Sequence, residues 1–142
     1  MKVMVIGRAS KESEAGVLPD PKLFADMDKF NEELVKAGVM LACEGLHSSA
    51  KGKRVRFSGT SSTVIDGPFT ASKELIAGFQ IWQVRSMEEA VEWVRRSPRC
   101  HAGDYEIEIR QVFEMEDFAP IVTPEMKERE ERFRAQVAGK KP

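Results

Sequence analysis

Cysteine, histidine and tyrosine are scarce in this sequence of 142 residues, which contains two cysteines, two histidines and one tyrosine. The two cysteines, Cys43 and Cys100, lie far apart and form no CxxC pair, so the sequence predicts neither a disulfide framework nor a zinc site. The two histidines, His47 and His101, lack the spacing of a metal-binding pair on one helix or strand. We therefore expect reduced thiols, no bound metal and no cofactor.

The sequence also lacks long hydrophobic runs and a large excess of charge of one sign. The apolar run at its start ends at Gly7 and is followed by Arg8 and Lys11, too early for a signal peptide or a membrane span. The formal net charge of -1 gives no electrostatic footprint for nucleic acid. No P-loop, dinucleotide fingerprint or nucleophile elbow is present. We therefore expect a cytoplasmic protein that binds neither membrane nor nucleic acid.

Hydrophobic residues make up 42% of the chain and charged residues 32%, which fits one compact domain with a short appendage. Apolar runs predict four strands, and apolar residues at helical spacing predict two helices. The strands are expected at 3–6, 39–46, 76–84 and 105–113. The first helix is expected between the cap Asp20 and the stop Gly38, and the second between the capping box at Ser86 and the stop at Ser97-Pro98. The polar stretch 11–21, which connects the first strand to the first helix, is expected to be a loop.

Two short runs at 55–57 and 63–65 flank a turn that contains Gly59, a pattern that predicts a β-hairpin. With this hairpin set aside, the order of elements is the split βαβ pattern of the ferredoxin-like α+β fold. Two helices cover only one face of a four-stranded antiparallel sheet. Since the strand at 76–84 carries apolar residues on both faces, Phe79 and Ile81 on one and Trp82 on the other, we expect the second face to meet a partner.

The composition changes after Phe118, so we place the domain at 1–118 and a helical extension at 119–142. Thr123 and Pro124 form a helix start, with proline at the first helical position. The helix that follows is rich in Lys, Glu and Arg and carries a thin apolar stripe. Such a stripe fits either a solvated tail helix or an arm laid over a second subunit.

The stretch Asp66-Gly67-Pro68-Phe69 predicts a rigid corner. Gly67 can adopt positive φ, Pro68 fixes its own φ, and the Asp66 carboxylate can accept backbone N–H groups of the turn. Lys73 and Glu74 follow directly before an apolar strand. Asp66, Lys73 and Glu74 could therefore meet at one edge of the sheet.

This stretch resembles the signature of the YCII-related, or DGPF-domain, family, and the resemblance extends from residue 2 to about 118. Membership would imply a dimeric α+β barrel, a homodimer in which two sheets face each other. It would also imply kinship with small-molecule isomerases, dehydrochlorinases and monooxygenases that work without a protein-bound metal. One position departs from the motif: Ala71 stands where many members have an acidic residue, so any role of that acid is absent here.

Strand alternation places a set of charged side chains on the face that a dimeric barrel would enclose. In the last strand, Glu108 and Arg110 lie opposite the apolar face of Ile107 and Ile109. We expect a site near the meeting point of Glu44, His47, Asp66, Lys73, Glu74 and Arg110. Glu44, His47 and Asp66 are the candidates for proton transfer, and Lys73, Glu74 and Arg110 for binding a small anionic organic molecule.

Three functions fit these residues. The first is a metal-independent small-molecule enzyme of the proton-transfer, isomerase or lyase type with its site inside the barrel. The second is a non-catalytic dimer that binds or responds to a small ligand, and the third is a purely structural dimer. At the level of the site, the competing interpretation is that Lys73, Glu74 and Arg110 form an ion-pair network that holds the corner in place.

Overall fold

The computed structural model describes residues 1–70 and 73–140, so that Ala71 lies outside the described residues. The chain divides into two compact units, the first running from Met1 to Gln111 and the second beginning at Val112. None of the helices in the described residues is long and apolar enough to cross a membrane.

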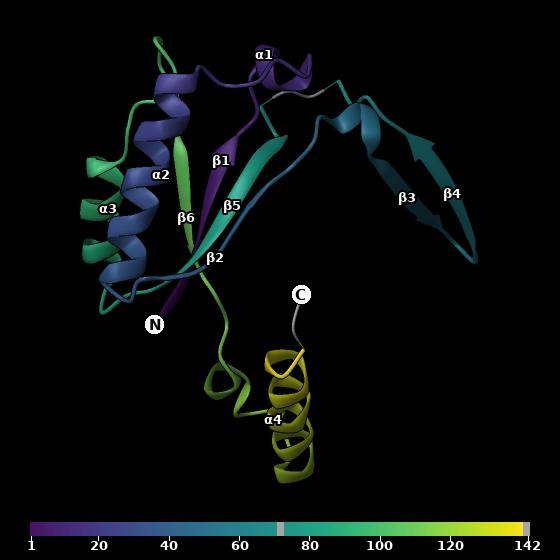
Figure 1. The fold of residues 1–142 in the computed structure, drawn as a ribbon. Helices are drawn as coiled ribbons and strands as arrows, with labels where there is room; N and C mark the ends of the chain where they lie inside the picture. The colour runs from purple at the N-terminus through teal and green to yellow at the C-terminus, as the bar shows by residue number, and fades with distance from the viewer. Residues whose placement is uncertain (71–72, 141–142) are drawn as a thin grey trace. The chain divides into compact units, whose positions relative to one another are not determined.

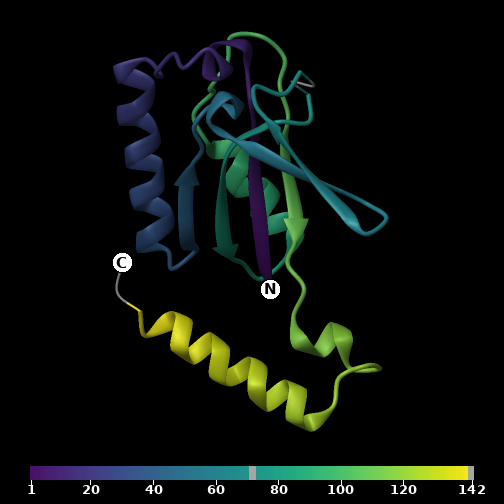
Figure 2. The ribbon, with the colours of Figure 1, turned by 90° about the vertical axis from the view of Figure 1, so that its right-hand side faces the viewer.

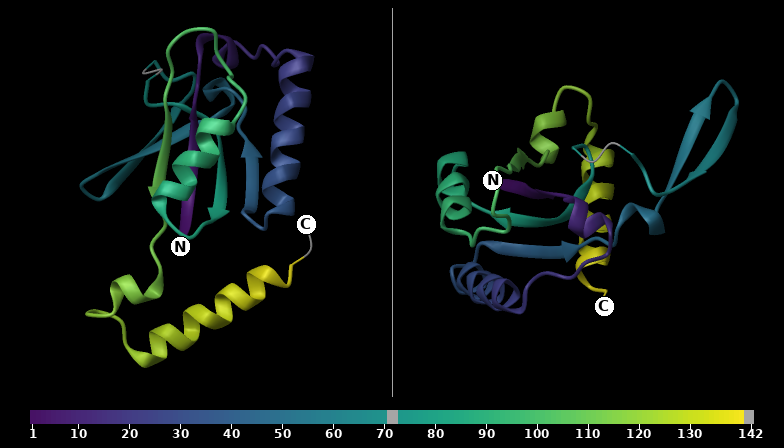
Figure 3. Two further views of the ribbon diagram at one scale, coloured as in Figure 1. Left: turned by 90° about the vertical axis from the view of Figure 1, so that its left-hand side faces the viewer. Right: turned by 90° about the horizontal axis from the view of Figure 1, so that it is seen from above.

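The first unit is built around a four-stranded antiparallel sheet in the order β2-β5-β1-β6 (Figure 1). Its strands are β1 (Lys2–Arg8), β2 (Met40–Gly45), β5 (Ile76–Gln83) and β6 (Ile107–Gln111). Helices α2 (Pro21–Lys36) and α3 (Met87–Arg96) lie on one face, α2 toward β2 and α3 toward β6 (Figure 3, left). The ferredoxin-like α+β fold predicted from the sequence is confirmed. The last strand is shorter than the predicted range of 105–113.

The core lies between this sheet and the two helices. Val3, Val5 and Trp82 point from the sheet toward the helices, and Phe30 and Leu34 of α2 meet them there. The indole N–H of Trp82 donates to Oε1 of Gln80 at 2.7 Å, so the largest buried side chain keeps its polar atom bonded. Strand alternation therefore decides which face of each strand is buried.

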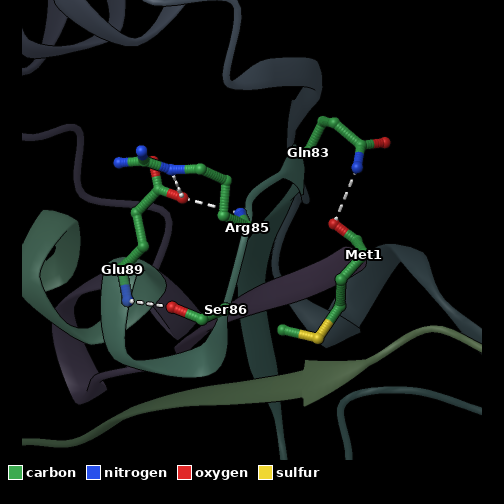
Figure 4. Close-up of polar contacts among 5 residues, drawn as sticks. All are labelled: Met1, Gln83, Arg85, Ser86 and Glu89. Carbon is green, nitrogen blue, oxygen red and sulfur yellow. Dashed lines mark hydrogen bonds and ion pairs between the residues drawn. The ribbon is translucent and has the colours of Figure 1, made fainter.

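The helices begin where their caps predict. The Asp20 carboxylate accepts the N–H of Lys22 at 2.7 Å at the start of α2, and Gly38 follows the helix with φ of 72°. At α3 the Ser86 hydroxyl accepts the N–H of Glu89 (Figure 4). In a capping box the Glu89 carboxylate would accept the N–H of Ser86. Here it accepts the N–H of the preceding residue, Arg85, at 2.6 Å, and this bond lowers the pKa of Glu89.

The opposite face of the sheet, called here the open face, is covered by neither α2 nor α3 (Figure 2). Met4 and Ile6 of β1 pair with Ile81 and Phe79 of β5 on this face, so its centre is apolar. Towards β6 the face becomes charged. The predicted alternation of β6, with Ile107 and Ile109 on the helix side and Glu108 and Arg110 on the open side, is confirmed. The predicted apolar residues on both faces of β5 are also confirmed, with Trp82 on the helix side and Ile81 on the open side.

The predicted hairpin forms a separate two-stranded sheet, β3 (Lys53–Ser58) and β4 (Ser61–Asp66), that extends away from the main sheet (Figure 1). Its turn contains Gly59 at φ of 57°, a conformation that glycine adopts without strain. Two short helices among the described residues of the first unit were not predicted. These are α1 (Lys11–Glu14), inside the expected loop, and the 3₁₀ turn η1 (Ser49–Lys51), which connects β2 to the hairpin.

The second unit contains the 3₁₀ turn η2 (Met115–Phe118) and helix α4 (Pro124–Ala138). The Thr123 hydroxyl accepts the N–H of Met126 at 3.2 Å, which confirms the predicted helix start. Within this unit the rings of Phe113 and Phe118 pack against each other at a tilt of 40°, with centroids 4.9 Å apart. Phe133 and Val137 on α4 are exposed, as a thin apolar stripe on a charged helix requires.

Candidate functional site

The corner at Asp66–Phe69 packs directly on η1. The N–H of Gly67 donates to the carbonyl of Gly52 at 3.0 Å, and the N–H of Phe69 donates to Oγ of Ser49 at 2.9 Å. A Cβ atom on Gly67 would lie 1.7 Å from the carbonyl oxygen of Ser49. Glycine is therefore required because two backbones touch. The expectation of positive φ at Gly67 is wrong, since its φ is not in the left-handed region.

The expected role of the Asp66 carboxylate in the turn is also wrong. This carboxylate is paired across the hairpin with Nζ of Lys53 at 2.5 Å, and both side chains are mostly exposed. The guanidinium of Arg54 lies 3.9 Å from the centroid of the Phe69 ring, which adds a cation–π contact to the corner. Asp66 and its neighbours thus join the hairpin to the domain.

The six residues proposed from the sequence occupy four places in one protomer. Glu44 and Arg110 belong to the open face, where Glu44 pairs with Phe79 and Arg110 pairs with Met4 in the strand register. His47 follows β2 and is exposed, and Asp66 closes the hairpin. Lys73 and Glu74 precede β5 and are exposed. The convergence of these six residues on one site stays a prediction.

The ion pairs also differ from the expected network. Glu108 is the central residue: its carboxylate accepts from Arg8 at 2.5 Å and from Arg110 at 3.2 Å. Among residues 1–70 and 73–140, no ion pair joins Lys73 or Glu74 to Arg110. The interpretation that those three residues satisfy one another is wrong, because Arg110 is held by a residue two positions before it on the same strand.

A large open cavity lies beside the end of β1 and the start of β6, and is called here the basic cavity. Its volume is about 1130 Å³. Five basic side chains line it against two acidic ones; the basic residues are Arg8, Lys11, Lys73, Arg95 and Arg99, and the acidic ones Asp104 and Glu106. Arg8 is already paired with Glu108, and Arg95 with Glu92. Lys11, Lys73 and Arg99 take part in no ion pair within the described residues, so their charges are available to an anion.

The segment between α3 and β6 shapes one wall of the basic cavity. Tyr105 lines the cavity, and its hydroxyl accepts the N–H of Cys100 at 3.2 Å. Its ring also packs edge-on against His101, with centroids 5.0 Å apart. Of the residues around this cavity, the sequence led us to Lys73 alone, because the other basic residues come from four separate segments and share no motif. No cluster of three or more potential metal ligands occurs in the part of the chain described.

The family is decided by a match that covers most of the chain: a family model described as YCII-related domain matches residues 1–116. The chain belongs to the YCII-related domain family. It is also similar to the uncharacterized protein R00369 of Rhizobium meliloti (strain 1021), with 27% identity over 90 residues that cover 62% of this chain and 73% of that protein. The family predicted from the Asp66–Phe69 motif is therefore confirmed.

A second cavity of the YCII-related domain lies between the sheet and the helices, and is called here the glycine-floored cavity. Its volume is about 230 Å³. Its floor is a row of three glycines, because Gly78 of β5 pairs with Gly7 of β1 on one side and with Gly45 of β2 on the other. The walls are mainly apolar and include Phe30 of α2. Glycine inside a strand signals a close approach or an empty space, so this row was detectable in the sequence.

Both cysteines of the YCII-related domain line the glycine-floored cavity, although they are far apart in the sequence. Burial raises the pKa of the Cys43 thiol, and a hydrogen bond with Gln80 offsets part of this effect. Burial also raises the pKa of the Cys100 thiol. At neutral pH both thiols are therefore protonated and uncharged, which makes them poor nucleophiles and keeps the cavity wall neutral.

Proposed function

We propose that this YCII-related domain binds a small anionic organic molecule in the basic cavity. The observation that carries the proposal is the excess of basic over acidic side chains around one cavity of about 1130 Å³. Lys11, Lys73 and Arg99 come from three different segments and face the same space. Convergent cations around a concave surface are the usual means of holding a carboxylate or phosphate.

Binding is the function that the geometry supports best. In a catalytic version of this function, the protein would also transfer a proton to or from the bound molecule. In that version, Glu44, His47 and Asp66 are the candidate acids and bases, with Glu74 and Arg110 as further contacts to the substrate. Glu44 and Arg110 share the open face. They would reach a ligand only if a second copy of the chain closed over that face. The catalytic version therefore depends on dimerisation, whereas binding at the basic cavity does not.

We further propose a homodimer in which the open faces of two protomers pack together. Met4, Ile6, Phe79 and Ile81 would form the apolar centre of this interface, and the Arg8–Glu108–Arg110 ion pairs would be enclosed beside it. We expect an interface that buries more than about 1,000 Å² and a dimer in sedimentation velocity at micromolar concentration. Ile81→Glu should give a folded monomer, because Ile81 points away from the core. A wild-type monomer would contradict the proposal.

Replacing Lys73 by methionine tests the basic cavity. We expect Lys73→Met to weaken binding of acetate and inorganic phosphate by roughly fivefold, about 1 kcal/mol, since one exposed charge is lost from the cavity. Chemical-shift titration of the full chain would measure both affinities. The free energy of unfolding should change little, because the structure assigns Lys73 no ion pair among the described residues.

Lys29→Met is the matched control for this test. Lys29 is exposed on α2 and does not line the basic cavity, so its replacement makes the same change in net charge at a different place. Equal losses of affinity in the two variants would mean that the anion responds to overall charge and not to this cavity. An unchanged affinity in Lys73→Met would remove Lys73 from the site.

A further inference from the structure

The basic cavity and the glycine-floored cavity share part of their lining. Val94 and Ser97, at the end of α3, and Ile107, at the start of β6, line both. The segment after α3 contributes to both as well, with Arg99 on the basic side and the adjacent Cys100 on the apolar side. A charged space and an uncharged space therefore lie next to each other in one domain.

The glycine-floored cavity exists because two of its glycines have empty space above them. No described heavy atom lies within 4 Å of a Cβ built on Gly45, and a Cβ on Gly7 would meet only the carbonyl oxygen of Gly78, at 3.8 Å. Both positions share the helix-facing side of the sheet with Val5, which is buried in the core. Side chains at these positions would therefore enter the cavity. Gly78 differs, because its Cβ would lie 2.8 Å from the carbonyl oxygen of Glu44.

The wall offers little to a polar ligand. The Gln80 amide is occupied on both sides, since its Nε2 donates to Asn31 at 3.1 Å and its Oε1 accepts from Trp82. The Ser97 hydroxyl donates to the carbonyl of Val94 at 2.6 Å. Glu44 also lines the cavity, but the register of β2 directs its side chain to the open face. With both thiols protonated, this space suits a hydrocarbon group.

From these observations we propose that the ligand of this domain is an aryl- or alkyl-carboxylate whose apolar group occupies the glycine-floored cavity. The claim about the carboxylate rests on the proposed function, in which the basic cavity holds an anion. The claim about the apolar group rests on the glycine row and the neutral wall. A cavity of about 150 Å³ can hold benzene, so about 230 Å³ accommodates one aromatic ring with a short linker.

The test compares phenylacetate with acetate, which shares the carboxylate and lacks the ring. We expect the wild-type chain to bind phenylacetate at least about tenfold more tightly than acetate, because the ring leaves water. Gly45→Val should abolish this advantage and leave the acetate affinity unchanged, since valine would fill the cavity without touching the basic side chains. Lys73→Met should weaken both ligands equally. Calorimetric or chemical-shift titrations would supply the affinities.

The outcomes separate the two proposals. If neither carboxylate binds, the proposed function fails and this inference fails with it. If both bind with equal affinity, or if Gly45→Val leaves the advantage of phenylacetate intact, the anion site stands and the apolar extension is wrong. Labelling of Cys43 and Cys100 gives a readout that needs no variant: phenylacetate should slow their alkylation by iodoacetamide, and acetate should not. Equal labelling rates with both ligands would overturn the inference even if Gly45→Val failed to fold.

Discussion

Replacing Gly67 by alanine is expected to destabilise the domain by more than about 3 kcal/mol, the upper end of the usual cost of overpacking. The new Cβ would lie 1.7 Å from the carbonyl oxygen of Ser49 and 2.7 Å from its carbonyl carbon. Neither atom can move aside as a flexible side chain would, because both belong to the backbone of η1. Relief would break the bonds of Gly67 to Gly52 and of Phe69 to Ser49. Urea denaturation followed by circular dichroism would measure the loss.

Gly103→Ala is the matched control. No described heavy atom lies within 4 Å of a Cβ on Gly103, and its φ is not in the left-handed region. The same chemical change there should alter the unfolding free energy by less than about 1 kcal/mol, through the unfolded state more than through contacts. Similar midpoints for the two variants would show that the contact between the corner and η1 does not hold in solution.

The second large effect is expected at Leu34. This side chain of α2 is fully buried against the sheet, with a relative exposure of 0%. Leu34→Ala should cost about 2–5 kcal/mol, because the apolar contacts of the side chain are lost and a cavity remains. The denaturation midpoint should fall while the slope of the transition stays the same.

Val35 provides a control one residue away on the same helix. Its relative exposure is 59%, and it faces away from the core. Val35→Ala should leave stability within about 0.5 kcal/mol of wild type, since alanine also favours helix. A loss comparable with that of Leu34→Ala would mean that α2 buries a different face from the one described.

The fold was predictable because each element carries its own local signal. Asp20 and Ser86 mark where the helices begin, and the alternation of the strand at 76–84 separates Phe79 and Ile81 from Trp82. The short helix α1 escaped prediction because a four-residue helix has too few residues for a periodic pattern. The need for glycine at position 67 was predicted, but for a reason of backbone conformation instead of close packing.

The candidate site was predictable only in part. Lys73 was found because it follows a recognisable motif, whereas Arg99 and Tyr105 belong to an irregular segment whose path no local pattern specifies. Arg110 was correctly assigned, together with Glu108, to the face away from the helices, and the two side chains form an ion pair there. Sequence periodicity gives the face of a strand. It does not give the neighbours that loops bring to the end of a sheet.

The position of β1 in the middle of the sheet has a consequence for synthesis on the ribosome. Both neighbours of β1 come from later parts of the domain, and its second residue, Val3, pairs with Gln111. A nascent chain must therefore expose its first strand without a partner until most of the domain has been made. The hairpin β3–β4 pairs residues that are close in sequence, so it can form long before the sheet closes. Chaperones that shield exposed apolar strands would act on this first strand, during the interval before β5 emerges.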